Sequence, residues 1–257
     1  MASVIAPLPW RAMACAQDDG PAARAAIGLI ALASDCVIEP ELRRFLPPDE
    51  GIGLYVNRIP MPRVANVETL GGMARDITET TRGLMPDDKL DVIAFGCTSG
   101  TMTIGAEGVA ERIRAARPAV ACSDPVSASL KGLRALGCRR IALLTPYVDE
   151  VNEVVGSYVA GQGFEIALKG SFKQAGDPEI CRVPPNDIFR AGLELGSGEV
   201  DGLFVSCTAL RVSPVLAELE AAIGKPVVAS NQALAWDCLR QAGVTDPVEG
   251  FGALMRL

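Results

Sequence analysis

Two segments of the chain follow the same plan, DVIAFGCT at residues 91–98 and DGLFVSCT at residues 201–208. In each segment an apolar run ends in a cysteine that is followed by a threonine, and the two cysteines are Cys97 and Cys207. Short, continuous apolar runs between helical patterns are typical of strands buried on both faces of a parallel sheet. The two segments therefore predict an α/β protein with a cysteine at the carboxyl end of a strand in each of two similar halves.

The order of landmarks repeats along the chain. We expect apolar strands at residues 26–32, 91–96, 119–122, 139–145, 202–206 and 226–230. Helical patterns lie between them, at residues 64–83, 105–116, 149–161 and 213–223. Offsets of 114, 110, 110 and 108 residues separate the equivalent positions Ile27 and Ile141, Asp91 and Asp201, Cys97 and Cys207, and Pro118 and Pro226. This near-constant offset indicates duplication of a half-domain.

We therefore predict two pseudo-symmetric, three-layer α/β halves with parallel sheets and an active-site cleft between them. The first half is placed at residues 22–121 and is completed by the C-terminal segment 233–257. The second half is placed at residues 122–232, and residues 1–21 are expected to form an N-terminal arm.

The composition excludes several classes of partner. The 257 residues are 49% hydrophobic and carry a formal net charge of -7, without a run of Lys or Arg. No segment approaches the roughly 20 uninterrupted apolar residues that span a bilayer, and the first residues lack the continuous apolar stretch of a signal peptide. We expect a soluble, cytoplasmic protein whose partner is a small molecule, not nucleic acid or a membrane surface.

The absence of histidine limits the chemistry. It excludes Ser-His-Asp and Cys-His nucleophile systems and histidine-containing zinc sites. The eight cysteines include no C-x-x-C pair, so we expect reduced thiols and no metal. No phosphate-binding glycine motif is present, and a nucleotide cofactor is not expected. Proton transfer must then use Cys, Asp, Glu, Lys or Tyr.

The carboxyl ends of parallel strands are where ligands bind in open sheets. We expect Cys97 and Cys207 to lie there, each at a turn from a strand into a helix. Thr98 and Ser99 in one half and Thr208 in the other can cap the following helix, or contact a substrate, or do both. A helix start favours an anion and lowers the pKa of a thiol, so the pattern predicts a carboxylate bound beside a thiolate.

These residues resemble the Asp/Glu racemase superfamily, in which two α/β halves each contribute a cysteine to one cleft. GLIALASD at 28–35, FGCTSGT at 95–101 and LLTPYVDEVN at 143–152 are most similar to the branch with maleate cis-trans isomerase, arylmalonate decarboxylase and ectoine-utilisation proteins. The resemblance implies that Cys97 and Cys207 are the reactive pair, that Tyr147 contacts the substrate, and that no cofactor is needed. It also implies a homodimer or homotetramer. Tyr147 could instead only pack at its strand end.

Two departures from maleate isomerase concern substrate choice. Asp35 stands where those enzymes carry a carboxylate-binding Asn, and it would repel a dianion but could accept hydrogen bonds from an amine, amide or hydroxyl. It could also assist Cys97, as in the racemases, or cap the helix that begins at EPELRRFL. The segment SFKQAGDPEICRV at 171–183 resembles a second binding loop, but Gly176, Asp177 and Pro178 stand where the isomerases have Asn, and the likeness ends there.

Two opposed thiols fit either racemisation at one carbon or addition to an alkene followed by rotation and elimination. We therefore predict a cofactor-independent isomerase or racemase of a small carboxylate, either amino-acid-derived or an unsaturated dicarboxylate. The presence of both cysteines argues against arylmalonate decarboxylase chemistry, because that enzyme resembles this pattern with only the second-half cysteine. A lyase that uses Cys207 alone, and a metabolite-binding protein without catalysis, remain alternatives.

Overall fold

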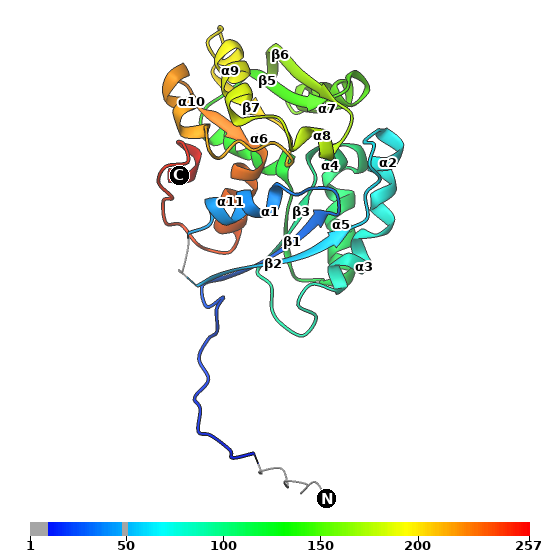
Figure 1. Cartoon of the computed structure of the whole chain (residues 1–257), viewed down its shortest axis with the longest axis vertical. Helices are drawn as coiled ribbons and strands as arrows, with labels where there is room; N and C mark the ends of the chain where they lie inside the picture. Colours follow the sequence, from blue (N-terminus) through cyan, green and yellow to red (C-terminus); the bar gives the residue numbers. More distant parts are fainter. Residues whose placement is uncertain (1–9, 48–50) are drawn as a thin grey trace, which may run out of the picture.

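Two four-stranded parallel sheets form the centre of the molecule (Figure 1). The computed structural model describes residues 10–47 and 51–257. The first sheet has the order β2-β1-β3-β4, with bounds Ile52–Ile59, Ala25–Leu32, Val92–Gly96 and Ala121–Ser123. The second has the order β6-β5-β7-β8, with bounds Glu165–Gln174, Arg140–Tyr147, Gly202–Val205 and Val227–Ala229. Every strand pairing is parallel, and the two orders are equivalent.

The degree of burial of each strand explains whether it could be predicted from the sequence. All residues of β1, β3, β7 and β8 are buried, and β5 is buried apart from its first residue. Such central strands read as unbroken apolar runs. The edge strands β2 and β6 are mostly half-buried and carry polar residues, as in IGLYVNRI and EIALKGSFKQ. Neither edge strand was expected from the sequence.

Helices cover both sheets. In the first half they are α1 (Ile38–Phe45), α2 (Val67–Gly72), α3 (Ile77–Arg82), α4 (Thr98–Ile104) and α5 (Ala106–Ala116). The others are α6 (Pro125–Ala135), α7 (Asp149–Gly161), α8 (Asp177–Ile180), α9 (Pro185–Gly196), α10 (Leu216–Ile223) and α11 (Ser230–Gln241). Two short 3-10 helices span Met73–Arg75 and Leu254–Arg256.

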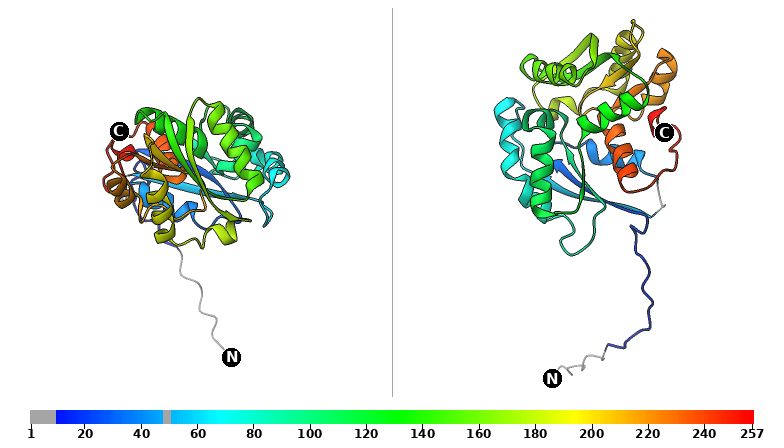
Figure 2. Two further views of the ribbon diagram at one scale, coloured as in Figure 1. Left: turned by 90° about the horizontal axis from the view of Figure 1, so that it is seen from above. Right: turned by 180° about the vertical axis from the view of Figure 1, so that it is seen from behind.

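The layers agree with the predicted fold class. Helices α3 and α5 contact each other and the first sheet, while α1 and α11 form a second contacting pair on its opposite face (Figures 1 and 2). In the second half α9 contacts β5, β6 and β7, α10 contacts β8, and α7 contacts β5 and β6. The prediction of an α/β fold with two parallel sheets and flanking helices is confirmed.

The two halves exchange a helix. Helix α6 follows β4 of the first sheet but packs on β7 and β8, and α11 follows β8 of the second sheet but packs on β3 and β4. The two exchanged helices also pack against each other, as the view from behind shows (Figure 2). The predicted boundary at residues 121 and 122 falls within β4. The exact division of the chain into halves stays a prediction.

Helix bounds differ from the expected ones in three places, and the simplest difference is that the helix expected at 213–223 begins only at Leu216, as α10. The pattern at residues 64–83 is divided into α2, a 3-10 turn and α3. The helix expected at 105–116 is preceded by a separate helix, α4, and Gly105 at the break has a φ of 89°, which favours glycine. Residues 10–19 extend away from the two sheets (Figure 2), and the start of the predicted arm, residues 1–9, lies outside the described residues. No helix of the described residues is long and apolar enough to cross a membrane.

Candidate active site

Cys97 caps the helix that follows it. It comes directly after β3, and its Sγ accepts a hydrogen bond from the backbone N–H of Gly100 at 3.2 Å. The hydroxyl of Ser99 lies 3.9 Å from the same sulfur. The cap was expected from Thr98 and Ser99, but they are the first two residues of α4 and the thiol itself occupies the N-cap position. Helix α4 thus fixes the direction of the Cys97 side chain.

Gly100 makes this close approach possible. A Cβ atom at this position would lie 2.9 Å from the sulfur of Cys97 and 2.6 Å from the terminal methyl of Met73. Both distances are shorter than any ordinary contact, so a side chain here would displace the thiol or the methionine. The glycine of the FGCTSGT segment is therefore required by the packing around the sulfur.

Cys207 lies at the end of the equivalent strand but is held differently. Its φ is 134°, a backbone conformation that non-glycine residues rarely adopt, and its Sγ accepts a hydrogen bond from the N–H of Ala209 at 3.4 Å. The next helix, α10, begins only at Leu216, so the prediction that Cys207 lies at a helix start is wrong. A strained backbone at a candidate active residue costs about 1–3 kcal/mol and persists only where its surroundings fix it.

Ser230 joins the two cysteine turns. Its Oγ accepts a hydrogen bond from the N–H of Cys207 at 3.0 Å and another from the hydroxyl of Thr98 at 3.0 Å. Ser230 is the first residue of the exchanged helix α11 and is fully buried. The sequence analysis did not identify this residue, because a serine that starts a helix gives no signal of its long-range partners.

The threonine of the second turn reaches the first turn. The Thr208 hydroxyl lies 3.4 Å from the carbonyl oxygen of Gly96, and the Asn231 side chain donates to the carbonyl of Thr208 at 2.7 Å. Thr208 directly follows Cys207, and Gly96 directly precedes Cys97. The structure therefore brings the two predicted Cys-Thr turns together at the junction of the halves.

Tyr147 lies at the end of β5 between the same residues. It exposes 4% of its surface, and its hydroxyl forms no hydrogen bond within the described part of the chain. Burial raises the pKa of Tyr147 well above its ordinary value, and the nearby thiols of Cys207 and Cys97 raise it further. The hydroxyl stays protonated and is placed as a donor beside Cys207, which agrees with a position in the site.

Asp35 has one occupied and one free oxygen. Its Oδ1 accepts the backbone N–H groups of Val37 at 2.7 Å and Ile38 at 2.9 Å, so it caps the start of α1. Its Oδ2 is buried and has no hydrogen-bond partner among the described residues. Burial raises the pKa of Asp35, against the effect of these donors and of Thr208 and Arg58. Capping and substrate binding are thus compatible, because each uses a different oxygen.

Asp177 is a second carboxyl group at the site. It begins the short helix α8, which lies at the junction of the two halves (Figure 1), and the hydroxyl of Ser34 donates to its Oδ2 at 2.5 Å. Burial and the negative charge of Asp35 raise the pKa of Asp177 to about 6. The sequence analysis noted residues 176–178 but gave Asp177 no role. Its contact with Ser34 spans 143 residues, which sequence patterns do not show.

Both thiols are protonated in this arrangement. Cys97 exposes 4% and Cys207 5% of its surface. Burial raises the pKa of Cys97 to about 12, with a further increase from Asp177 and a decrease from the Gly100 N–H. Burial and then Asp177 also raise the pKa of Cys207 well above its ordinary value. The expectation of a lowered thiol pKa is therefore wrong for this structure, because desolvation outweighs the N–H donors.

Glu41 supports the Cys207 loop from the other half. It lies on α1 and is buried, and its carboxylate accepts the N–H of Val212 at 3.2 Å and the N–H of Ser213 at 3.1 Å. The Ser213 hydroxyl donates to it as well, at 2.5 Å. Burial raises the pKa of Glu41, and these donors oppose that increase. This carboxylate thus takes over the ordering role that a helix start was expected to have.

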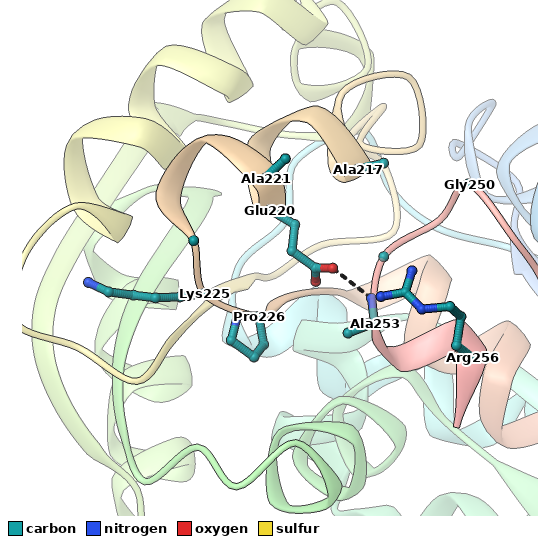
Figure 3. Close-up of a pocket in the computed structure, with 10 residues that line it drawn as sticks. Ala217, Glu220, Ala221, Lys225, Pro226, Gly250, Ala253 and Arg256 are labelled. Carbon is teal, nitrogen blue, oxygen red and sulfur yellow. Dashed lines mark hydrogen bonds between the residues drawn. The ribbon is translucent and has the colours of Figure 1, made fainter.

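Other features lie apart from the cysteines. A surface hollow of ≈ 440 Å³ between α10 and the C-terminal segment is lined by none of the site residues described above (Figure 3). Its Glu220 accepts the N–H of Ala253 at 2.7 Å and that of Val227 at 3.0 Å, which is a structural role. Among residues 10–47 and 51–257, no group of three or more His, Cys, Asp or Glu side chains is placed to hold a metal ion.

The site and the fold agree with a known family. The family described as arylmalonate decarboxylase matches residues 75–255. The chain belongs to the arylmalonate decarboxylase family. It is 35% identical over 125 residues to arylmalonate decarboxylase of Bordetella bronchiseptica, which covers 48% of this chain and 52% of that protein. It is also 28% identical over 243 residues to maleate isomerase of Nocardia farcinica, which covers 90% of this chain and 95% of the relative.

A solved structure extends the likeness of this arylmalonate decarboxylase family member. A Cys-to-Ser variant of the Nocardia farcinica maleate cis-trans isomerase, with a covalently bound succinylcysteine intermediate, has a TM-score of 0.81 and 26% identity. The match covers 90% of this chain and 98% of that chain. The predicted resemblance to the branch with maleate isomerase and arylmalonate decarboxylase is confirmed.

Proposed function

We propose that this chain is a cofactor-independent isomerase of a small carboxylate, with Cys97 and Cys207 as its reactive pair. The observation that carries the proposal is the direct contact of the two Cys-Thr turns, through the Thr208 hydroxyl and the Gly96 carbonyl and through Ser230. Maleate isomerase relatives, including one with a succinylcysteine intermediate, support a cysteine-based isomerase.

Two reaction courses suit this pair. In racemisation, one sulfur as thiolate takes the proton from the carbon beside the carboxylate, and the other sulfur as thiol gives a proton to the opposite face. In cis-trans isomerisation, a thiolate adds to the alkene, the resulting single bond rotates, and elimination returns the thiolate. Each course needs one thiol to lose its proton, which the raised pKa values of the buried thiols oppose.

The remaining site residues have separate roles in the proposal. Thr98, Ser99 and Thr208 supply donors for the substrate carboxylate, and Ser99 in addition faces the Cys97 sulfur. Tyr147 supplies its unpartnered hydroxyl. Asp35 sets substrate choice through its free oxygen. Because both sulfurs are almost completely buried, a substrate reaches them only when the junction between the halves opens.

Single replacement of each cysteine tests the proposal. Cys97→Ser and Cys207→Ser proteins would be incubated with enantiopure amino acids, hydantoins, maleate and ectoine-pathway intermediates, and stereochemistry and alkene geometry followed by chiral chromatography and NMR. We expect either change to abolish turnover, while Cys138→Ser, a buried cysteine outside the site, keeps it. Unchanged turnover in both site variants would refute the two-thiol mechanism.

The arylmalonate decarboxylase relative supports a second candidate function, that of a lyase. A lyase with one protonating cysteine predicts release of carbon dioxide from an arylmalonate, with Cys207 alone required. A metabolite-binding protein predicts binding without turnover of any of these compounds. The same set of variants, with carbon dioxide measured, separates the three functions.

We further propose a homodimer or homotetramer that acts in the cytoplasm on a small carboxylate, without nucleic acid, membrane or cofactor as partner. We base a place beside ectoine utilisation on the likeness of GLIALASD, FGCTSGT and LLTPYVDEVN alone. Light scattering tests the assembly, and growth of a deletion strain on ectoine tests the metabolic place.

A further inference from the structure

Two carboxyl groups lie near the thiols, one from each half of the molecule. Asp35 follows β1, and Asp177 begins α8. The hydrogen bond from Ser34 to Asp177 places the second carboxyl group against the residue that precedes the first. Each carboxyl group raises the pKa of both Cys97 and Cys207, so both lie within electrostatic range of both sulfurs.

One buried oxygen of Asp35 makes no hydrogen bond of good geometry, although the Thr208 hydroxyl lies near enough to lower the pKa of this carboxyl group. Its Oδ2 has no partner in the described part of the chain, and the residue exposes 1% of its surface. A buried polar atom without a hydrogen bond costs about 1–3 kcal/mol, which a ligand with a suitable donor would recover. The Tyr147 hydroxyl also makes no hydrogen bond to an oxygen or nitrogen of the described residues and lies beside the Cys207 sulfur, so the junction offers both an acceptor and a donor.

The positive charge near Asp35 is the guanidinium of Arg58, and it is already engaged in other hydrogen bonds. The Arg58 guanidinium donates to the carbonyl oxygens of Leu32 and Asp35 at 2.9 and 2.8 Å, and it pairs with Glu39 at 3.1 Å. It therefore faces the outer side of the turn instead of a ligand between the sulfurs. A dicarboxylate at this place would bring two more negative charges next to two buried carboxyl groups, which low dielectric makes costly.

We propose that Asp35 and Asp177 form a subsite for a nitrogen substituent, so that the enzyme selects a small monocarboxylate with an amino or ureido N–H group over a dicarboxylate. This inference rests on the proposed function, because it places the substrate carbon between Cys97 and Cys207. An amino group and a ureido group share the N–H donors that a carboxylate oxygen accepts. The carboxylate end of the substrate then points away from the acid pair, toward the hydroxyl and N–H donors.

Binding affinity, measured without turnover, tests the subsite independently of the catalytic role of the cysteines. A Cys97→Ser, Cys207→Ser protein keeps the shape of the site and removes turnover, so calorimetry on it measures affinity alone. The probes are alanine, N-carbamoylalanine, propionate and maleate. We expect alanine or N-carbamoylalanine to bind at least about tenfold more tightly than propionate and maleate, a difference of about 1.4 kcal/mol. The two nitrogen probes show whether the donor is a charged amine or a neutral ureido group.

Isosteric variants in the same background assign the preference. Asp35→Asn and Asp177→Asn should each weaken binding of the preferred nitrogen compound at least about tenfold, and the double variant should bind maleate more tightly than its parent. Asn at position 35 still accepts the N–H groups at the start of α1, so the fold is expected to persist, as circular dichroism would verify. Glu179→Gln is the matched control, because this carboxylate on α8 pairs with Arg63 and should leave the preference unchanged.

The outcomes are distinct. Maleate binding as tight as that of the nitrogen compounds, and unaffected by both Asn variants, would overturn the subsite while leaving the cysteine chemistry intact. Loss of turnover of every compound when the same Asn changes are made in the protein with both cysteines intact, with unchanged affinities in the serine background, would also overturn it, since the acids would then assist the thiols instead of binding nitrogen. If the cysteine variants retain full turnover, the proposed function fails independently.

Discussion

The two cysteine turns have the same sequence pattern but different support. Cys97 lies in extended backbone with a φ of -146° and caps α4 with its own sulfur. Cys207 lies in a strained backbone with a φ of 134°, in a loop that Glu41 of the other half holds by its carboxylate. The two halves thus share the position of the thiol at the strand end, whereas the structure that orients it differs between them.

This difference suggests how the two sulfurs acquire separate roles. The first sulfur accepts a hydrogen bond from a helix N–H, which stabilises its thiolate. The second accepts the longer contact from the Ala209 N–H, which begins no helix, and it lies beside the Tyr147 hydroxyl. The comparison favours Cys97 as the sulfur that is deprotonated first.

The largest effect is expected from a substitution that disrupts the first turn. Gly100→Ala would place a Cβ atom 2.9 Å from the Cys97 sulfur, and we expect a loss of about 100-fold or more in kcat/KM with about 1–3 kcal/mol of destabilisation from overpacking. Steady-state kinetics and thermal unfolding measure the two effects. Gly108→Ala on α5, where a Cβ meets only Arg112 and Ile104 atoms at 3.3 and 3.6 Å, is the control. Full activity of Gly100→Ala would contradict the role given to the α4 cap.

The next largest effect is expected from removing the hydrogen bonds of Glu41 to the second turn. Glu41→Gln replaces an acceptor oxygen by an NH₂ group facing N–H donors, so we expect about 1–3 kcal/mol of destabilisation and a fall in kcat of about tenfold. Denaturant unfolding and kinetics give both values. Glu39→Gln on the same helix, an exposed partner of Arg58, should change little. Equal behaviour of the two variants would show that Glu41 does not order the Cys207 loop.

The smallest effect concerns the acid pair between the turns. The pKa of Asp177 is raised to about 6, so the carboxylate is charged above that pH and protonates as the pH falls through it. Binding of the preferred nitrogen compound should therefore weaken about tenfold between pH 7 and pH 5, with Asp35, Cys97 and Cys207 as the ionisable neighbours. Calorimetry across this range measures it. Asp177→Asn should remove the dependence, and its persistence in that variant would assign it to another group.

The sequence predicted the strands and cysteines of the site, but not the long-range hydrogen bonds that hold them in place. Strands β3 and β7 and both cysteines were found because central parallel strands are continuous apolar runs. The edge strands were missed because half-buried strands mix polar and apolar residues. Ser230 and Glu41 were missed because their partners lie far away in the sequence, as the 171-residue separation of Glu41 and Val212 illustrates.

The thiol pKa shows a different limit of sequence reasoning. A helix start after Cys97 was expected to lower the pKa, and the helix is there, but the degree of burial was not predictable from the segment itself. Desolvation depends on residues far away in the sequence, such as Thr208 and Ser230, which contact the first turn only in the folded chain.

A short arsenical tests the central claim most directly, since phenylarsine oxide loses water and joins two thiols only when both lie close to one arsenic atom. The background would be a Cys36→Ser, Cys181→Ser protein, because those two thiols lie near each other and would compete for the reagent. The account predicts one arsenic per chain, bridging the peptides that contain Cys97 and Cys207 in mass spectrometry, with loss of the bridge when either is changed to serine. Arsenic bound elsewhere, while both cysteines react independently with a monofunctional reagent, would contradict it.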